Sequence, residues 1–228
     1  EDSGEDFLTF AIHSPDGDQG FPGDLDFTVT YRLTETALHL HYHGVCDQDT
    51  VINPTNHSYF NLAGQEETGK ALEQLLWIHA DCFTPEGPDS IPTGEVLPVA
   101  GTPMDFRTEK AVGRDIEADY DPLHYQNGYD HNYILLSKEL TRPAARLRDP
   151  GSGRVMTVYT DCPGLQLYTA NYLNCHGKGG IYYPNQSAVC LESQFYPDSV
   201  NHPQFPSSVL KAGEIYDSET VFAFSAEG

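Results

Sequence analysis

Basic residues are scarce in this sequence. Its 228 residues include 12 Lys and Arg against 34 Asp and Glu, which gives a formal net charge of −22. A surface this acidic repels the phosphate groups of nucleic acids and of anionic membranes. We therefore expect neither nucleic acid nor a membrane among the partners of this protein. A strongly solvated surface is the simplest explanation of the acidic excess.

Long apolar segments and paired cysteines are also missing. No apolar run approaches the roughly 20 residues that a membrane-spanning helix needs. The five cysteines contain no CxxC pair and match no zinc-binding spacing. An odd number of thiols with such spacings is typical of a reducing compartment. We therefore expect a cytoplasmic protein, and these cysteines indicate no zinc site.

Aromatic and turn-forming residues, in contrast, are abundant. The chain has 14 Tyr, 11 Phe, 20 Gly and 16 Pro, a composition that favours short strands joined by many turns. Residues 27–33 alternate apolar side chains with Thr and Arg, and residues 38–43 alternate apolar side chains with His. Such a period of two indicates half-buried strands. The turn at Glu35 between them predicts an antiparallel hairpin.

Further segments have the composition of strands and are separated by loops with Gly or Pro. They are residues 75–83, 133–136, 145–148, 155–160, 165–169, 188–192 and 221–224. Short helical turns are expected after Asp105 and over residues 65–71, and no long helical period stands out. There is no internal repeat, low-complexity linker or break in composition. The sequence predicts one all-β domain over residues 1–228.

Residues 53–64 (NPTNHSYFNLAG) place many hydrogen-bonding groups around the imidazole of His57. A histidine near its ordinary pKa can donate or accept a proton at neutral pH. An isolated histidine is more often a structural residue in a turn, but this dense polar surrounding favours chemistry. We predict that His57 is a catalytic proton donor. We also expect Asn56 and Tyr59, which flank it, to contact the substrate.

Asp130 lies in a second polar segment, residues 128–133 (GYDHNY), where a loop is expected to enter a strand. A carboxylate beside tyrosine rings suits a sugar, because hydroxyls donate to the acid while the C–H faces of the sugar pack on the rings. An Asp that caps the start of a strand is the alternative. This segment alone leaves both interpretations open.

Glu192 closes the apolar run of residues 188–192, so its carboxyl group is expected to point into the protein. Desolvation would raise its pKa, as a general base at neutral pH requires. The alternative is a buried Glu that is paired with a nearby base. Glu192 is therefore the second candidate for acid/base chemistry.

Seven sequence motifs carry a resemblance to a known family. They are residues 14–23, 53–64, 91–94, 101–106, 128–132, 163–169 and 191–207. Together they resemble the aldose 1-epimerases, the galactose mutarotases, in the order of that family and over nearly the whole chain. One such motif is a weak signal, whereas seven in order are a strong one.

This resemblance implies a large antiparallel β-sandwich. It also implies interconversion, without a metal ion or other cofactor, of the α and β anomers of free aldohexoses such as galactose and glucose. It implies that Glu192 takes the proton of the C1 hydroxyl while His57 protonates the ring oxygen. Asp130 matches the aspartate with which the family binds sugar hydroxyls. A monosaccharide is thus the expected partner.

The sequence departs from the family at its N-terminal side. Members carry an N-terminal portion with an arginine and a further histidine in the sugar site, and neither has a counterpart here. We therefore expect a truncated member, the larger C-terminal part of the domain, with the opening strands of the sandwich missing. Its sugar pocket would lack one wall, and its strand edges would be exposed.

Alternative functions follow from the same residues. A glycosidase could use Asp130 and Glu192 as paired carboxylates, although this leaves the polar segment around His57 unexplained. A hexose-phosphate epimerase of related fold would need clustered Arg or Lys, whereas the seven arginines are scattered. A non-catalytic carbohydrate-binding module is the third alternative. The histidines at positions 39, 41 and 43 share a strand face, which we expect to be a solvated outer face rather than a metal site.

Overall fold

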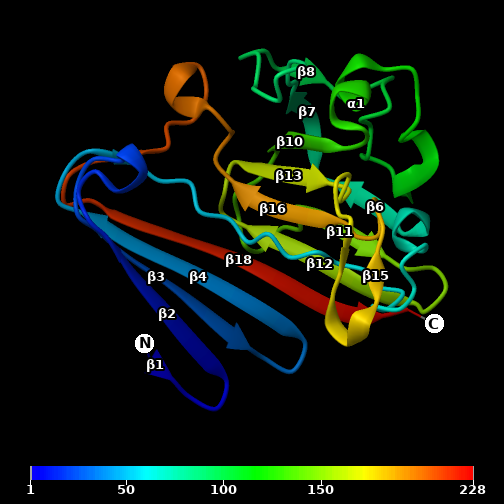
Figure 1. Ribbon diagram of the computed structural model, residues 1–228, viewed down its shortest axis with the longest axis horizontal. Coiled ribbons are helices and arrows are strands. Elements are labelled where there is room, and N and C mark those ends of the chain that lie inside the picture. The colour runs from blue at the N-terminus through cyan, green and yellow to red at the C-terminus, as the bar shows by residue number, and fades with distance from the viewer. Residues whose placement is uncertain (1, 228) are drawn as a thin grey trace.

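The computed structural model describes residues 2–227, and strands make up most of its regular structure (Figure 1). Every strand pairing within the described residues is antiparallel. No helix in this part of the chain is long and apolar enough to cross a membrane. The prediction of a β-rich protein with large antiparallel sheets is confirmed.

One large sheet has nine strands, and its longest members fan out toward the N-terminal edge (Figure 1). In spatial order the strands are β1 (Asp2–Ser3), β2 (Phe7–Ser14), β3 (Leu25–Leu33), β4 (Ala37–Cys46), β18 (Ile215–Ala226), β12 (Arg154–Thr160), β11 (Ala145–Arg148), β6 (Leu75–Ile78) and β9 (Lys110–Ala111). The predicted hairpin is present as β3 and β4, with Phe27 opposite Gly44.

A second sheet has five strands and forms the floor of the polar pocket described below. Its order is β16 (Cys190–Gln194), β13 (Gly164–Tyr168), β10 (Asp130–Leu135), β7 (Ala80–Thr84) and β8 (Leu97–Pro98). Two small sheets pair β5 (Thr50–Val51) with β17 (Val209–Leu210), and β14 (Cys175–His176) with β15 (Tyr182–Tyr183).

Helical structure is limited to short pieces. The α-helix α1 (Asp121–Gln126) has Pro122 in its first turn and ends at Asn127, which has a left-handed conformation. The 3-10 turns are η1 (Asp18–Gly20), η2 (Ala71–Glu73), η3 (Val112–Asp115), η4 (Lys178–Gly180) and η5 (Ser199–Asn201). A helical turn was expected over residues 65–71, and the structure forms it later, as η2, which begins at Ala71. The helical turns expected after Asp105 are η3 and α1.

The expectation of one strand over residues 75–83 is wrong. The chain forms β6 and β7 there, and the two strands belong to different sheets. The break falls at His79, whose backbone N–H donates to the carbonyl of Ala144 and whose carbonyl accepts from Leu136. The local pattern is strand-like throughout, but the choice of sheet depends on partners that are remote in the sequence.

A single hydrophobic cluster joins the two large sheets. It includes Leu40 and Phe222 of the nine-stranded sheet and Phe83 and Leu165 of the five-stranded sheet, all of them almost completely buried. Burial of such side chains is the main favourable contribution to folding. The cluster also fixes which face of β10, β13 and β16 is left for polar side chains.

Candidate active site

Two rows of polar side chains cross one face of the five-stranded sheet. In the first row Asn132 lies opposite Gln166, and Gln166 lies opposite Glu192. In the second row Asp130 lies opposite Tyr168. Side chains two residues apart on a strand share a face, so both rows project on the same side of the sheet. Three strands that are remote in the sequence thereby place their polar groups together.

These side chains contribute to a pocket of about 450 Å³. The residues that line it are His57, Tyr59, Glu86, Ser90, Asp130, Gln166, Tyr168, Glu192, Gln194 and Pro197. We call this site the polar pocket. Its volume falls in the range of roughly 300–1,000 Å³ that is common for small-molecule sites.

His57 reaches the polar pocket from the loop that follows β5. A pair of backbone hydrogen bonds between Phe60 and Val189 holds this loop beside the start of β16. As a result, Nε2 of His57 lies 3.4 Å from Oε1 of Glu192. The His57 side chain is 49% exposed while that of Glu192 is 8% exposed, so the imidazole faces the pocket opening and the carboxylate its floor. The predicted acid and base are thus adjacent.

Two tyrosine rings hold the imidazole in place. The ring of Tyr59 stacks on that of His57, with centroids 4.9 Å apart and an interplanar angle of 18°. Tyr168 contacts His57 edge-on, with centroids 5.8 Å apart. Such aromatic pairs restrict the orientation of a side chain beyond what burial alone would do. Tyr59, which we expect to contact the substrate, lines the polar pocket, and Tyr168 is an addition that the sequence did not single out.

The electrostatic environment of Glu192 suits proton transfer at neutral pH. Burial, followed by the neighbouring negative charge of Asp130, raises the pKa of the Glu192 carboxyl to about 7. A general base is most effective when its pKa lies near the working pH. The desolvation that the sequence predicted for Glu192 is therefore present.

Asp130 is positioned by a chain of amide groups. Nε2 of Gln166 donates to Oδ1 of Asp130 at 2.9 Å, and Nε2 of Gln194 donates to Oε1 of Gln166 at 3.1 Å. Burial raises the pKa of Asp130 above its ordinary value, and the hydrogen bond from Gln166 offsets only part of this rise. The oxygens of Asp130 that remain open to the pocket can accept hydrogen bonds from sugar hydroxyls. Gln166 and Gln194 were not singled out from the sequence, because the search was for side chains that can transfer protons and an amide cannot do so.

Glu86 is a third carboxyl group in the polar pocket, and sequence reasoning missed it entirely. It lies just after β7, is 8% exposed, and its Oε2 accepts a hydrogen bond from Nε2 of Gln126 at 2.9 Å. Burial, together with the charge of Asp130, raises its pKa to about 8. Neighbouring Pro and Gly made this segment look like an ordinary loop, so no local signal pointed to burial.

Two residues of the predicted motifs point elsewhere. The Asn56 amide donates to the hydroxyl of Tyr31 at 3.4 Å, and Asn56 is not among the residues that line the polar pocket. His131 faces the core, where it packs edge-on against Phe83. Burial lowers its pKa to about 4, which keeps it neutral. Strand alternation thus separates Asp130 in the pocket from the histidine beside it.

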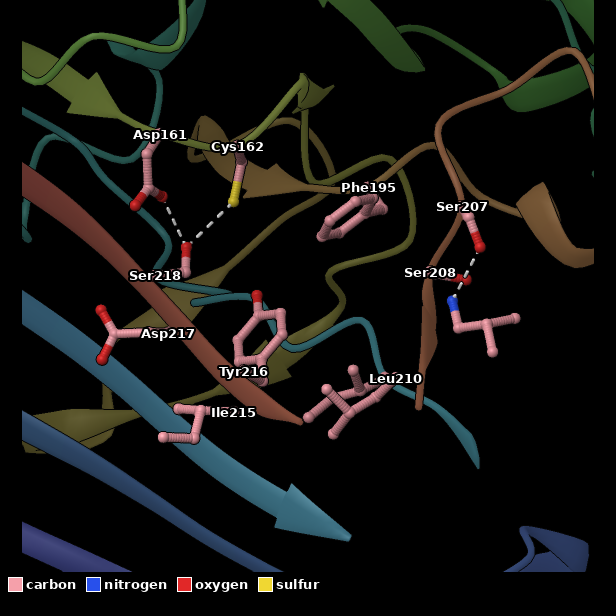
Figure 2. A pocket seen from close by; sticks show the side chains of 12 residues that line it. Asp161, Cys162, Phe195, Ser207, Ser208, Leu210, Ile215, Tyr216, Asp217 and Ser218 are labelled. Carbon is pink, nitrogen blue, oxygen red and sulfur yellow. Dashed lines mark hydrogen bonds between the residues drawn. The ribbon is translucent and has the colours of Figure 1, made fainter. Parts of the chain in front are cut away.

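A separate pocket of about 300 Å³ lies between β18 and the segment of residues 207–210 (Figure 2). In it, Oγ of Ser218 donates to Oδ1 of Asp161 at 2.6 Å and lies 3.4 Å from Sγ of Cys162. Phe195 and Tyr216 supply aromatic rings to its walls (Figure 2). No histidine is among its lining residues, and its two carboxylates are those of Asp161 and Asp217. It therefore lacks the contact between a histidine and a glutamate that the polar pocket contains.

Solved structures resemble this architecture over the entire chain. An aldose epimerase homologue from C. elegans superimposes with a TM-score of 0.89 at 27% identity, covering 100% of this chain and 68% of that one. A galactose 1-epimerase from Lactobacillus acidophilus gives a TM-score of 0.84 at 29% identity, covering 100% of this chain and 65% of that one. The fold and the pocket thus define a β-sheet protein of the galactose mutarotase type.

Sequence comparison identifies the family. The family model of the aldose 1-epimerases matches residues 1–223. Human galactose mutarotase is 44% identical over 220 residues, which are 96% of this chain and 63% of the human protein. The aldose 1-epimerase of Escherichia coli K12 is 39% identical over 225 residues, 96% of this chain and 64% of that protein. This chain belongs to the aldose 1-epimerase family, and it spans 63% of the length of the mammalian relatives that it matches.

Proposed function

We propose that this chain carries the acid/base pair of an aldose 1-epimerase acting on free aldohexoses such as galactose or glucose. The observation that carries the proposal is the 3.4 Å contact between Nε2 of His57 and Oε1 of Glu192 in an open pocket. Membership of the aldose 1-epimerase family supports it. The predicted roles of both residues are kept in this proposal.

The reaction needs two coordinated proton transfers. The Glu192 carboxylate removes the proton of the C1 hydroxyl, while protonated His57 gives its proton to the ring oxygen. The bond between C1 and the ring oxygen breaks, and the open-chain aldehyde forms. Rotation about the C1–C2 bond followed by the reverse transfers closes the ring on the other face. Each positioned acid or base contributes on the order of 10²–10⁴ in rate.

The remaining pocket residues bind the sugar in this proposal. Asp130, held by Gln166, accepts hydrogen bonds from hydroxyls, and Glu86 provides a further polar contact. The rings of Tyr59 and Tyr168 offer apolar surface to the C–H faces. Asn56 was predicted to bind substrate, and its contact with Tyr31 favours an indirect contribution through the His57 loop.

The pocket composition favours a neutral monosaccharide over a sugar phosphate. No Lys or Arg is among the residues that line the polar pocket, whereas two of the lining residues are Glu and one is Asp. A phosphate would meet repulsion there and no basic partner. The net charge of −22 argues against nucleic acid as a partner in the same way. Because all five cysteines are free thiols, we also propose a cytoplasmic location.

Anomer exchange observed by NMR tests this proposal. Exchange spectroscopy on glucose or galactose in the presence of the chain should show transfer between the α and β C1 protons well above the rate in buffer. Chemical-shift perturbation measures binding in the same samples. Binding without faster exchange would instead identify a carbohydrate-binding module and would refute the enzymatic proposal.

A further inference from the structure

A thiol lies directly beside the proposed acid/base pair and has no part in the reaction. Cys190 is on β16 two residues before Glu192, so the two side chains share a face of the strand. A side-chain nitrogen of His57, Sγ of Cys190 and a carboxylate oxygen of Glu192 all lie within 4.8 Å of one another. Within residues 2–227 this is the one group of three such side chains with spacing suited to a metal ion.

The Cys190 side chain is fully buried and chemically idle in this structure. Its exposed fraction is 0%, and no hydrogen bond of its thiol is found among the described residues. Burial raises its pKa, so the thiol stays protonated and unreactive toward oxidants at neutral pH. A soft cation that replaces the proton would give the sulfur the partner that it lacks.

The three donors match the preferences of zinc. Imidazole nitrogen, thiolate sulfur and carboxylate oxygen are its usual ligands, with three protein ligands and an open fourth position in accessible sites. Bond lengths of this kind place ligand atoms roughly 3.4–3.8 Å apart around a tetrahedral ion. The contact between His57 and Glu192 already measures 3.4 Å. A contraction of about 1 Å by side-chain rotation would bring Sγ into the same shell, while the exposed side of His57 leaves room for water.

We infer that His57, Cys190 and Glu192 form a binding site for a thiophilic divalent cation, Zn²⁺ in particular, whose occupancy blocks the polar pocket. On binding, the Cys190 thiol releases its proton to solvent and the sulfur becomes a thiolate ligand. The His57 nitrogen and the Glu192 carboxylate donate lone pairs to the ion and can no longer transfer protons. Zinc is therefore an inhibitor here and not a participant in catalysis. The binding site stands on geometry alone, whereas the inhibition rests on the proposed function.

Cobalt is the direct probe of the site, because a Co²⁺–thiolate bond produces a charge-transfer band in the near ultraviolet. All proteins in this experiment, including the parent, carry the substitution Cys175→Ser, because Cys175 is exposed and could bind the ion by itself. We expect titration with Co²⁺ to produce the band at one equivalent and Zn²⁺ to displace it. The variant Cys190→Ser keeps the other two ligands, and it should abolish the band and weaken Zn²⁺ binding in calorimetry at least tenfold.

A matched control comes from the outer face of the large sheet. His41 is also paired with a carboxylate, that of Asp217 at 3.0 Å, but has no thiol nearby. His41→Ala should therefore bind Zn²⁺ and Co²⁺ as the parent does. Absence of the cobalt band in the parent, or its persistence in Cys190→Ser, would overturn the metal site.

Anomer exchange supplies the second measurement. Zn²⁺ should slow exchange at least tenfold in the parent, with recovery on addition of a chelator. Cys190→Ser should keep its exchange rate in the presence of the same Zn²⁺ concentration, because it lacks the thiolate ligand. Its rate without zinc should match that of the parent, because Cys190 does not line the polar pocket. Zinc binding without inhibition would support the metal site but refute the acid/base roles of His57 and Glu192. Inhibition that is equal in Cys190→Ser would refute the site while leaving the proposed function intact.

Discussion

Nε2 of His57 lies 3.4 Å from Oε1 of Glu192, although the two residues come from a loop after β5 and from β16. One partner is half-exposed and the other is almost fully buried. In the proposed reaction, an acid at the opening and a base on the floor act on two different atoms of one bound sugar ring. This relationship is the basis of the predictions on catalysis.

Removal of either member of the pair should abolish exchange without unfolding the protein. His57→Asn and Glu192→Gln each keep the approximate size and polarity of the side chain but remove the proton transfer. We expect the exchange rate to fall by about 10²–10⁴-fold in each. NMR exchange measures the rate, and circular dichroism checks the fold. Rates near that of the parent in either variant would contradict the assigned chemistry.

Exchange should become faster as the pH rises from the acid side toward 7. Burial raises the pKa of Glu192 to about 7, and only the ionised carboxylate can accept the C1 proton. Because the proposed reaction also needs protonated His57, this rise belongs to the acid side, and the rate at low sugar concentration should climb over roughly pH 5 to 7 after subtraction of the buffer-catalysed rate. Glu192→Gln should lack this rise. A profile that is flat in the parent over the same interval would argue against Glu192 as the base.

Glu86 should make the folded state less stable as the pH rises. Its folded-state pKa of about 8 lies above its ordinary value of 4.5, so between these values the native state binds more protons than the unfolded state. The contribution of Glu86 to the free energy of unfolding is then greatest below about pH 4.5 and falls toward pH 8, by at most about 1.4 kcal/mol per pH unit.

The variant Glu86→Gln removes this contribution and should flatten the fall. We expect it to raise the midpoint of urea unfolding at pH 8 and to change it little at pH 4.5. Glu66→Gln is the matched control, since Glu66 is an exposed loop residue. Equal pH dependence in the two variants would show that Glu86 is not the responsible group. Weaker sugar binding by Glu86→Gln in the same preparations would support its proposed contact with substrate.

Gly128 should be required for the position of Asp130. Its φ of +140° is disfavoured for other residues, and an added Cβ would lie 2.5 Å from Oδ1 of Asn171. We expect Gly128→Ala to lower the free energy of unfolding by about 1–3 kcal/mol and to weaken sugar binding. Gly69→Ala is the control, because an added Cβ meets nothing within 4 Å there. Equal unfolding midpoints for both variants would contradict the strain argument.

Strand β2, the second strand from the edge of the large sheet, should promote self-association. Leu8, Phe10 and Ile12 share one face of β2 and are 42%, 48% and 62% exposed. Exposed apolar rows at a sheet edge favour pairing with other chains. Ile12→Lys should lower the average mass measured by light scattering at high protein concentration. Ala11→Lys adds the same charge on the opposite face, and an equal effect there would assign the change to net charge instead.

The sequence by itself determined the β-rich class, the β3–β4 hairpin and the segments that hold the candidate acid and base. These features are encoded locally, as alternation of apolar residues, as turn residues and as a dense polar motif around His57. It also pointed to desolvation of Glu192, because an acid that ends an apolar run has little chance of reaching water. Family resemblance added the direction of proton transfer.

Only the tertiary structure decided which side chains meet. The register of β10, β13 and β16 places Gln166 opposite Glu192 and Asp130 opposite Tyr168 on the same face, and strand pairing between remote segments cannot be read from local patterns. Burial of Glu86 likewise depends on α1 and its Gln126, and the split at His79 depends on hydrogen-bond partners that lie next to β10 and β11. The proximity of Cys190 to the pair has the same origin. Long-range packing places these groups within a few ångströms, and such distances set both their pKa values and their chemistry.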